Sequence, residues 1–558
     1  MKMKANLNKI EEITMKKIII LLTIVTLHGL NAAELPINPV PEIEAPKHNP
    51  KSLLKIVNEK VCGKNYEKLE TLVQDNNLEQ VDLILENNKK ILNANAFVNL
   101  FNYVQSDDMI NVFLNRTNYS VNTTTTFQET PLHFASYKGQ TKTVKFLIEK
   151  KNASLNERDQ HGHTPLHIAS AQGRMEIVKL LIDNNASINE KTNLGNTPLH
   201  IALDKNQIEI AKLLIDNNAS LDEKNQNGDT PLHLASKTGQ IEIIKLLIDN
   251  NASLNEKTNL GNTILHIASA QGRMEIVKLL IDNNVSFNEK GQDGFTPLHI
   301  ASQHGKIETV KLLIEKNASI NEKTIFGHTP LHLASASSDE NIEVVKLLID
   351  NNASINEKDQ NGNIPLHFAL NNNQMEIVKL LIEKNASINE KDQNGNTPLH
   401  TASKIGQMEI VKLLIEKNAS INEKNQHGQT PLRIALEKKQ TEIAKFLINN
   451  NTSSSLDEKD QHGQTLLHIA LGLEQTEIAK LLIEKNASIN EKDQHGQTPL
   501  YIALAREQIE IAKLLIEKNA SINEKNQYGD TPLRVALDKN QIEIVKLLIE
   551  KNALLNEN

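Results

Sequence analysis

Residues 392–424 read DQNGNTPLHTASKIGQMEIVKLLIEKNASINEK, and units of this kind fill most of the chain. Successive units lie 33 residues apart, except for three steps of 34, 35 and 35 residues. One nineteen-residue stretch, HIASAQGRMEIVKLLIDNN, occurs unchanged at 167–185 and at 266–284. A unit that is copied whole and in register predicts a repeat architecture, because a catalytic site needs only one constellation of residues. Thirteen copies align on the tetrapeptide TPLH and begin at Thr130, Thr164, Thr197, Thr230, Thr263, Thr296, Thr329, Ile364, Thr397, Thr430, Thr465, Thr498 and Thr531.

The residues of this unit predict two helices and a loop. Thr397 is suited to cap a helix that starts at Pro398 and ends before Gly406. The second helix covers QMEIVKLLIEKN at 407–418 and carries a wide aliphatic face. It ends at Asn418, because asparagine tolerates the left-handed backbone conformation better than most residues other than glycine.

The period and the TPLHxA motif resemble those of the ankyrin-repeat family over residues 128–558. The resemblance implies an all-α fold, an ankyrin-repeat solenoid of stacked helix pairs with projecting β-hairpin-like loops, which we call fingers. It also implies that the chain binds proteins. The chain departs from the family in one respect. The residue that turns the chain after the second helix is usually glycine, but it is asparagine in all thirteen copies, from Asn152 to Asn552.

The irregular steps support this division of the chain. The extra residues fall near Lys151, within Ser335–Asn341 and at Ser453–Ser455. All three places are predicted connections, where insertions are tolerated, and none is expected to interrupt a helix. Ile364 takes the place of the capping threonine in the eighth copy, so we expect weaker coupling there.

Residues 1–33 contain the pattern of a secretory signal peptide. Two lysines precede an apolar run from Ile18 to Leu27, small residues follow, and Met15 is a second candidate for the start. The run is about half the ~20 residues that span a bilayer. The pattern predicts export to the periplasm or the extracellular medium, with membrane contact only during export. An uncleaved anchor and a buried helix are the alternatives, and a chain whose signal is unused would be cytoplasmic.

Two further segments precede the clear repeats. Residues 34–50 hold five prolines and predict an extended linker. Within 51–127, the stretches LEQVDLILENNKKIL at 78–92 and MINVFLNRTNYSVN at 109–122 match the second helix of the unit but lack a preceding TPLH. We expect one or two degenerate repeats that cover the apolar end of the stack. A small independent helical domain is the alternative.

Composition limits the chemistry. Tryptophan is absent and aromatic residues make up only 3% of the chain, which predicts an aliphatic core. The net charge of −8 comes from interspersed acids and bases, so no basic stripe for nucleic acid is expected. Cys62 is the only cysteine, which leaves no partner for an intramolecular disulfide. Since no hydrolase, kinase or phosphate-loop motif occurs, we expect no enzyme, no cofactor, no small-molecule substrate and no metal site.

Histidine is the one residue type that suggests chemistry. Ten of nineteen histidines occupy the TPLH position, from His133 to His468. Either they form a row of metal ligands or each bonds the backbone between neighbouring units. The structural role is favoured, because copies with Arg433, Tyr501 or Arg534 at this position keep the rest of the unit.

Most finger positions are polar, but three consecutive fingers carry apolar residues. An apolar side chain at an exposed tip costs solubility and usually has a use. We therefore predict a protein-binding patch, with neutral drift or packing between fingers as the alternative. Its predicted apolar centre is Leu260, Phe295, Ile325 and Phe326. Its predicted polar rim is Gln292, Asp293 and His328.

Taken together, these features predict an exported scaffold that binds proteins without catalysis. The combination of a signal with ankyrin-type repeats resembles proteins that intracellular or parasitic microbes direct at host proteins, an analogy at the level of fold alone. Two alternatives remain: a structural spacer without a privileged partner, and a cytosolic adaptor protein.

Overall fold

The structure is a computed structural model that describes residues 64–87, 92–451 and 453–556. These residues form helices and loops and contain no strand. The chain divides into two compact units, Met1–Thr126 and Phe127–Asn558. The predicted signal and linker, at residues 1–50, lie outside the described residues.

The first unit contains two helix pairs. They are α3 (Lys64–Gln74) with α4 (Leu78–Asn87), and α5 (Ala94–Leu100) with α6 (Asp107–Arg116). Helix α3 packs on α4 and α5, and α4 packs on α6. The stretches expected to be helical at 78–92 and 109–122 contain α4 and all but the first two residues of α6.

Aromatic rings contribute to the core of this unit, so the expectation of an aliphatic core was wrong here. Phe97, Phe101 and Phe113 are fully buried. The Phe97 ring lies 5.5 Å from the Phe101 ring and 6.4 Å from the Phe113 ring, both in edge-on arrangements. A low content of aromatic residues in the whole chain does not exclude a high content in one part, because here these residues are concentrated in one short segment.

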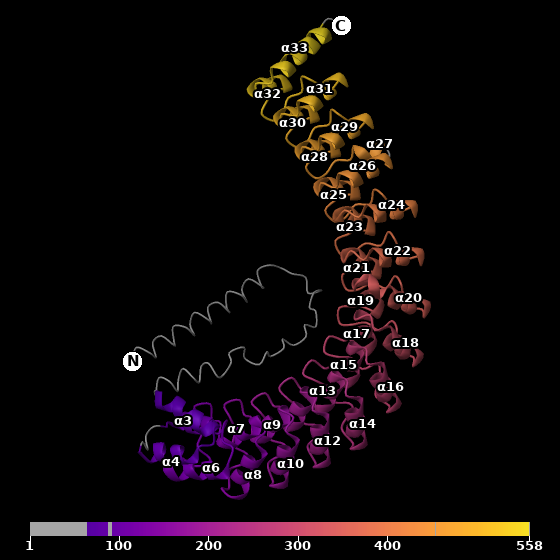
Figure 1. Cartoon of the computed structure of the whole chain (residues 1–558). Helices are drawn as coiled ribbons and strands as arrows, with labels where there is room; N and C mark the ends of the chain where they lie inside the picture. The colour runs from indigo at the N-terminus through magenta and orange to yellow at the C-terminus, as the bar shows by residue number, and fades with distance from the viewer. Residues whose placement is uncertain (1–63, 88–91, 452, 557–558) are drawn as a thin grey trace. The chain divides into compact units, whose positions relative to one another are not determined.

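In the second unit, each TPLH-aligned segment folds into two antiparallel helices. Figure 1 shows the first and second helices of these pairs as two neighbouring rows. Each first helix packs on the next first helix, and each second helix on the next second helix. The first helices are α7 (Pro131–Lys138), α9 (Pro165–Ala171), α11 (Pro198–Asp204), α13 (Pro231–Thr238), α15 (Ile264–Gln271), α17 (Pro297–Gln303), α19 (Pro330–Ala336), α21 (Pro365–Asn371), α23 (Pro398–Ile405), α25 (Pro431–Glu437), α28 (Leu466–Gly472), α30 (Pro499–Ala505) and α32 (Pro532–Asp538). The second helices are α8 (Thr141–Glu149), α10 (Met175–Asp183), α12 (Ile208–Asp216), α14 (Ile241–Asp249), α16 (Met274–Asp282), α18 (Ile307–Glu315), α20 (Ile342–Asp350), α22 (Met375–Glu383), α24 (Met408–Glu416), α26 (Thr441–Asn449), α29 (Thr476–Glu484), α31 (Ile509–Glu517) and α33 (Ile542–Asn556).

The helix ends follow from the residues predicted to set them. Thr397 has the extended backbone of an N-cap and Pro398 begins α23. Gly406 ends that helix at φ 91°, a left-handed conformation that glycine adopts without steric cost. Ile410, Val411 and Leu414 form the buried face of α24.

The asparagine that follows the second helix has a positive φ in most copies, as predicted. This holds at Asn152, Asn185, Asn218, Asn251, Asn284, Asn317, Asn352, Asn385, Asn418, Asn486 and Asn519. The prediction was wrong for Asn552, which lies inside α33 because that helix continues to Asn556.

The insertions lie in connections, but two of them form short helical turns. Lys151 lies in the turn after α8. The insertion at Ser335–Asn341 completes α19 and then forms a 3₁₀ turn, η1 (Asp339–Asn341). The third insertion forms α27 (Ser453–Leu456), between α26 and the following finger.

Candidate functional site

Eight of the ten TPLH histidines bond the backbone of the following finger through Nε2, as the structural interpretation predicted, whereas Nε2 of His233 and of His367 has no hydrogen-bond partner among the described residues. In the sixth copy, the backbone N–H of Thr296 donates to Nδ1 of His299, and Nε2 of His299 lies 3.0 Å from the carbonyl oxygen of His328 in the following finger. Nδ1 is thus an acceptor and Nε2 a donor, which fixes the neutral ring. Burial lowers the pKa of His299 to about 4.

A second set of contacts joins the fingers through the recurring NASINEK sequence. The backbone N–H of Ser420 donates to Oδ1 of Asn389 in the preceding repeat at 2.9 Å, and Nζ of Lys391 lies 2.7 Å from Glu423 in the following one. The same two contacts recur along the stack. The lysine–glutamate pairs are Lys191–Glu223, Lys224–Glu256, Lys257–Glu289, Lys290–Glu322, Lys323–Glu357, Lys358–Glu390, Lys391–Glu423, Lys424–Glu458, Lys459–Glu491 and Lys492–Glu524.

Backbone hydrogen bonds between adjacent fingers bring the predicted apolar residues into one row. The N–H of Gln292 donates to the carbonyl oxygen of Leu260 at 3.0 Å, and the N–H of Ile325 donates to that of Asp293 at 3.0 Å. Phe326 in turn accepts from the N–H of Gln360 at 3.0 Å. The three fingers therefore present their tips side by side, held by main-chain contacts rather than by the side chains themselves.

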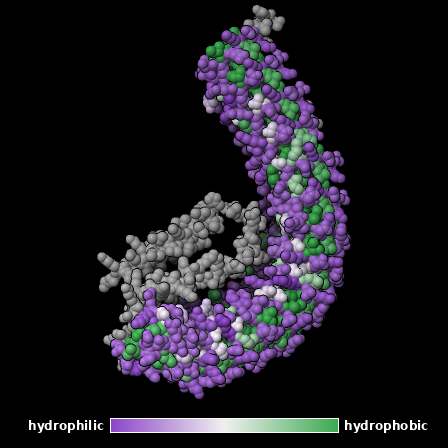
Figure 2. Space-filling view, viewed as in Figure 1, coloured by the Kyte–Doolittle hydropathy of each residue, from purple (hydrophilic) through white to green (hydrophobic). Residues whose placement is uncertain are grey.

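The tips of this row are exposed. Leu260 is 65% exposed, Ile325 53% and Phe326 41%, and Gln292 and Asp293 are also exposed. Figure 2 shows a largely hydrophilic surface on which hydrophobic residues form separate areas. Leu260 lies on one tip, and Ile325 and Phe326 lie on the tip two fingers further on, while the finger between them has the polar tip residues Gln292 and Asp293. Most other finger tips are polar, apart from Phe127, Leu194 and Tyr528.

Two predicted residues lie deeper than expected. Phe295 is half-buried, with its ring 5.9 Å from that of His299, because it follows the turn glycine instead of preceding it. His328 is also half-buried, with Nε2 3.5 Å from Oδ2 of Asp359. These two rings form the wall behind the tips, so His328 does not belong to an exposed rim.

Sequence reasoning missed Phe368, which completes this wall. Its ring lies 5.0 Å from the His328 ring and 5.1 Å from the His332 ring, in both cases edge to face. The Phe326 ring lies 5.8 Å from the same His328 ring. An aromatic residue directly after the TPLH histidine was the available signal, because most copies have Ile or Leu there.

Leu194 is a second residue that the sequence analysis did not select. It occupies the same place in the sequence KTNLGN as Leu260 and is 48% exposed. Its neighbouring fingers carry polar tips, as those beside Leu260 do, but neither has a phenylalanine after its turn glycine as the finger beside Leu260 has at Phe295. We use the name finger patch for Leu260, Ile325 and Phe326 together with Phe295, His328 and Phe368.

Within the part of the chain that the structure describes, no group of three or more His, Cys, Asp or Glu side chains is placed to hold a metal ion. None of the helices described there is long and apolar enough to cross a membrane.

The family comparison agrees with this architecture. A family model of ankyrin repeats, three copies long, matches the chain in overlapping segments from residue 69 to residue 558. The chain therefore belongs to the ankyrin-repeat family, whose members serve as scaffolds for protein–protein interaction. The first matched segment, 69–192, includes most of the described part of the first unit, residues 64–87 and 92–126. No curated protein matches the chain significantly.

Proposed function

We propose that this chain is an exported, non-catalytic scaffold that binds one protein partner through the finger patch. The observation that supports the proposal best is the exposure of Leu260 on one finger tip and of Ile325 and Phe326 two fingers further on, on three fingers that main-chain bonds hold in register. Interface energy is concentrated in a few apolar and aromatic anchors backed by packed side chains. The half-buried rings of Phe295, His328 and Phe368 supply that backing.

The charges around the patch favour a protein over a polyanion. Lys290 and Lys323 lie at the bases of these fingers, where their ammonium groups are 2.6 Å from Glu322 and 2.7 Å from Glu357. Paired lysines contribute little to binding phosphates, because their charge is already neutralised locally. The exposed apolar tips with polar neighbours such as Gln292 and Asp293 instead have the composition of a small protein interface.

Photocrosslinking tests this proposal. A photoreactive phenylalanine analogue at Ile325 should give one dominant crosslinked partner in extract from cells that the exported chain encounters. The same analogue at Gln393, an exposed tip two fingers further along, is the matched control. Equal crosslinking from the two positions would overturn the finger patch as the binding site.

The export half of the proposal depends on residues 15–33 alone. Mass spectrometry of the mature N-terminus tests it independently of binding. A new N-terminus near residue 34 is expected, whereas a chain that begins at Met1 or Met15 would contradict export and favour a cytosolic adaptor. If the chain comes from a microbe that lives in a host, the proposed partner is a host protein.

A structural spacer is the second candidate function. The uniform ladder of lysine–glutamate and serine–asparagine contacts favours it, because such contacts stiffen a stack without selecting a partner. The spacer predicts no dominant crosslink from Ile325, so the same experiment separates the two candidates.

A further inference from the structure

One step of the stack lacks the backbone hydrogen bond that joins finger turns at the other described steps, although the lysine–glutamate pair of the ladder is present there as Lys424–Glu458. At the preceding step, the N–H of Gln426 donates to the carbonyl oxygen of Asn394 at 2.9 Å, and at the following step Gln494 donates to His462 at 2.9 Å. Between these steps, no backbone hydrogen bond joins Gln461 to His427 among the described residues. We call the passage from the finger at 425–429 to the finger at 460–464 the hinge step.

The turn glycines show the same break. A Cβ atom on Gly395 would lie 2.9 Å from the backbone nitrogen of Gln426, and one on Gly463 would lie 3.1 Å from that of Gln494. A Cβ atom on Gly428 would meet no described atom within 4 Å. The fingers on the two sides of the hinge step are therefore not in contact at their turns.

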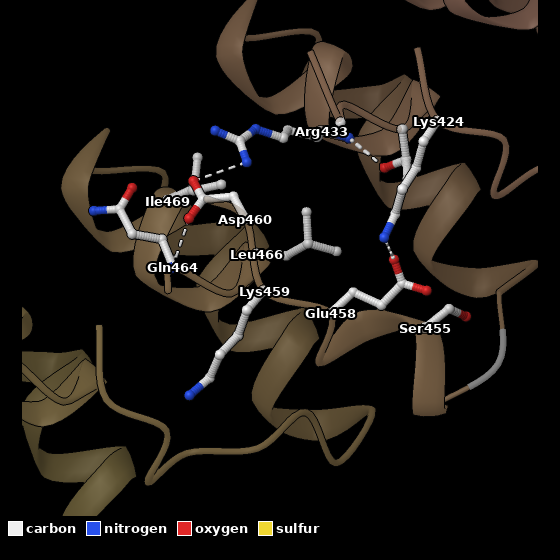
Figure 3. A pocket seen from close by; sticks show the side chains of 11 residues that line it. Lys424, Arg433, Ser455, Glu458, Lys459, Asp460, Gln464, Leu466 and Ile469 are labelled. Carbon is white, nitrogen blue, oxygen red and sulfur yellow. Dashed lines mark hydrogen bonds and ion pairs between the residues drawn. The ribbon is translucent and has the colours of Figure 1, made fainter. Parts of the chain in front are cut away.

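A small hollow lies at this step, as Figure 3 shows. Leu466 and Ile469 are among the residues that line it. Two ion pairs join its sides: Nη1 of Arg433 lies 2.9 Å from Oδ2 of Asp460, and Nζ of Lys424 lies 2.6 Å from Glu458 (Figure 3).

The hydrogen bond from the TPLH histidine to the next finger is also absent at this step, because Arg433 takes the place of the histidine. It stands where His400 stands in the preceding copy, and His400 Nε2 lies 3.0 Å from the carbonyl oxygen of Gln429 in the next finger. Arg433 instead binds two carboxylates, Asp460 and, through Nε at 2.8 Å, Glu437. A direct contact with the finger backbone is thereby replaced by side-chain ion pairs.

The position of the insertion explains why only this step is open. The insertion at Ser453–Ser455 lengthens the path from α26 into the finger. The equally long insertion at Ser335–Asn341 lies between α19 and α20, on the other side of the repeat, and there Gln360 still donates to Phe326 at 3.0 Å. The single extra residue near Lys151 also leaves a finger bond intact, from Gln160 to Phe127 at 2.8 Å.

The helices remain in contact across the hinge step. Helix α25 packs on α28, and α26 packs on α29. The Nε2 of Gln475 donates to the carbonyl oxygen of Leu436 at 2.6 Å, and Lys445 pairs with Glu477. The loss of contact is therefore confined to the finger turns, because the Lys424–Glu458 pair and the helical edge are both kept across the step.

We propose that the solenoid bends at the hinge step: the helical edge acts as the pivot, the two fingers separate, and the Arg433–Asp460 and Lys424–Glu458 ion pairs hold the closed form. Hinge motion needs a place where few contacts must break while neighbouring segments stay rigid. The hinge step meets this condition, because each segment beside it retains its complete set of finger bonds.

Spin-label distance measurements on the full chain test the proposal. In a Cys62→Ser background, labels at His427 and His495 span two finger steps that include the hinge step. Labels at Asn361 and His427 span two steps without it and are the matched control, since all three residues are exposed finger tips. The distance distribution should be clearly wider for the first pair, and Arg433→Gln with Lys424→Gln should widen it further.

Two deletions sharpen the test. Removal of Ser453 and Ser454 restores the 33-residue spacing and should narrow the distribution of the first pair to that of the control pair. Removal of Ser337 and Ser338, which belong to the other long insertion, should leave it wide. Equal widths for the two label pairs in the otherwise unchanged chain would overturn the hinge, and so would a double glutamine variant that folds normally without widening the distribution.

Discussion

Nε2 of His299 lies 3.0 Å from the carbonyl oxygen of His328, so a ring from one repeat is bonded to the finger of the next. The bond requires a neutral, correctly oriented ring, because Nδ1 accepts from the backbone N–H of Thr296. Equivalent bonds run from His167, His200, His266, His332, His400 and His468. The protonation state of this row is thus coupled to the stability of the stack.

We predict that stability falls as the pH decreases from about 6.5 towards 4. Burial lowers the pKa values of His167, His200, His299 and His332 to about 4 in the folded chain. In the unfolded chain their pKa is about 6.5, so the unfolded chain binds more protons than the folded chain between pH 6.5 and pH 4. Each ring therefore contributes on the order of 3 kcal/mol to the free energy of unfolding above this window, and this contribution is lost as the pH falls through it.

Melting temperatures measured from pH 7.5 to pH 4 check this prediction. Replacement of the exposed finger histidines His427, His462 and His495 by Asn is the control and should leave the pH profile unchanged. A melting temperature that stays constant down to pH 4.5 would show that the buried row is not linked to stability.

Three charged residues occupy left-handed positions where other copies have glycine. Lys439, Glu474 and Glu507 have φ values of 56°, 60° and 57° at the turn between first and second helices. Each change to Gly should stabilise the chain by about 0.5–1 kcal/mol, because glycine reaches this conformation without a Cβ clash. Thermal unfolding of the single variants gives the measurement.

The control for these changes is Lys438→Gly. Lys438 is one residue earlier and has a φ of −89°, so glycine there removes helix-end rigidity without relieving any strain. It should lower the melting temperature. If glycine has the same effect at 438 and 439, the left-handed conformation is not the cause.

The eighth repeat should open more readily than the ninth. In the ninth, Oγ1 of Thr397 lies 2.8 Å from Nδ1 of His400. Ile364 has no hydroxyl, so His367 keeps only the backbone contact to Nδ1, at 3.2 Å. Amide hydrogen exchange should be faster in α21 than in α23, by the factor that corresponds to the loss of about 1 kcal/mol of N-cap stabilisation. Equal protection of the two helices would count against the prediction, and would mean that the fully buried Ile364 side chain compensates.

The repeated structure was predictable because each helix end is set by a local residue. Threonine, proline, glycine and asparagine act within a few positions of themselves, and their repetition gives the same answer thirteen times. The exceptions involve contacts that no local residue specifies. The aromatic core of the first unit, the extension of α33 past Asn552 and the open finger step beside Gly428 all depend on neighbouring elements.

The candidate site was predictable in part for the same reason. Leu260, Ile325 and Phe326 stood out because most finger tips are polar, and the structure places them on the first and third of three fingers that main-chain bonds join in sequence. The depth of His328 and the contribution of Phe368 were not predictable, because a ring on one finger meets a ring on the first helix of the following repeat. That contact depends on the stacking geometry.

The most direct test of the binding proposal is capture of the photocrosslinked partner by a variant of the finger patch. Leu260→Ser with Ile325→Ser removes two exposed tips without touching the ring wall, and Gln393→Ser with Gln426→Ser is the matched change on neighbouring fingers. We predict that the first double variant loses the partner while its helical signal and melting temperature stay close to those of the unchanged chain, and that the second double variant retains the partner. Equal capture by the two variants would show that the finger patch is not the binding site.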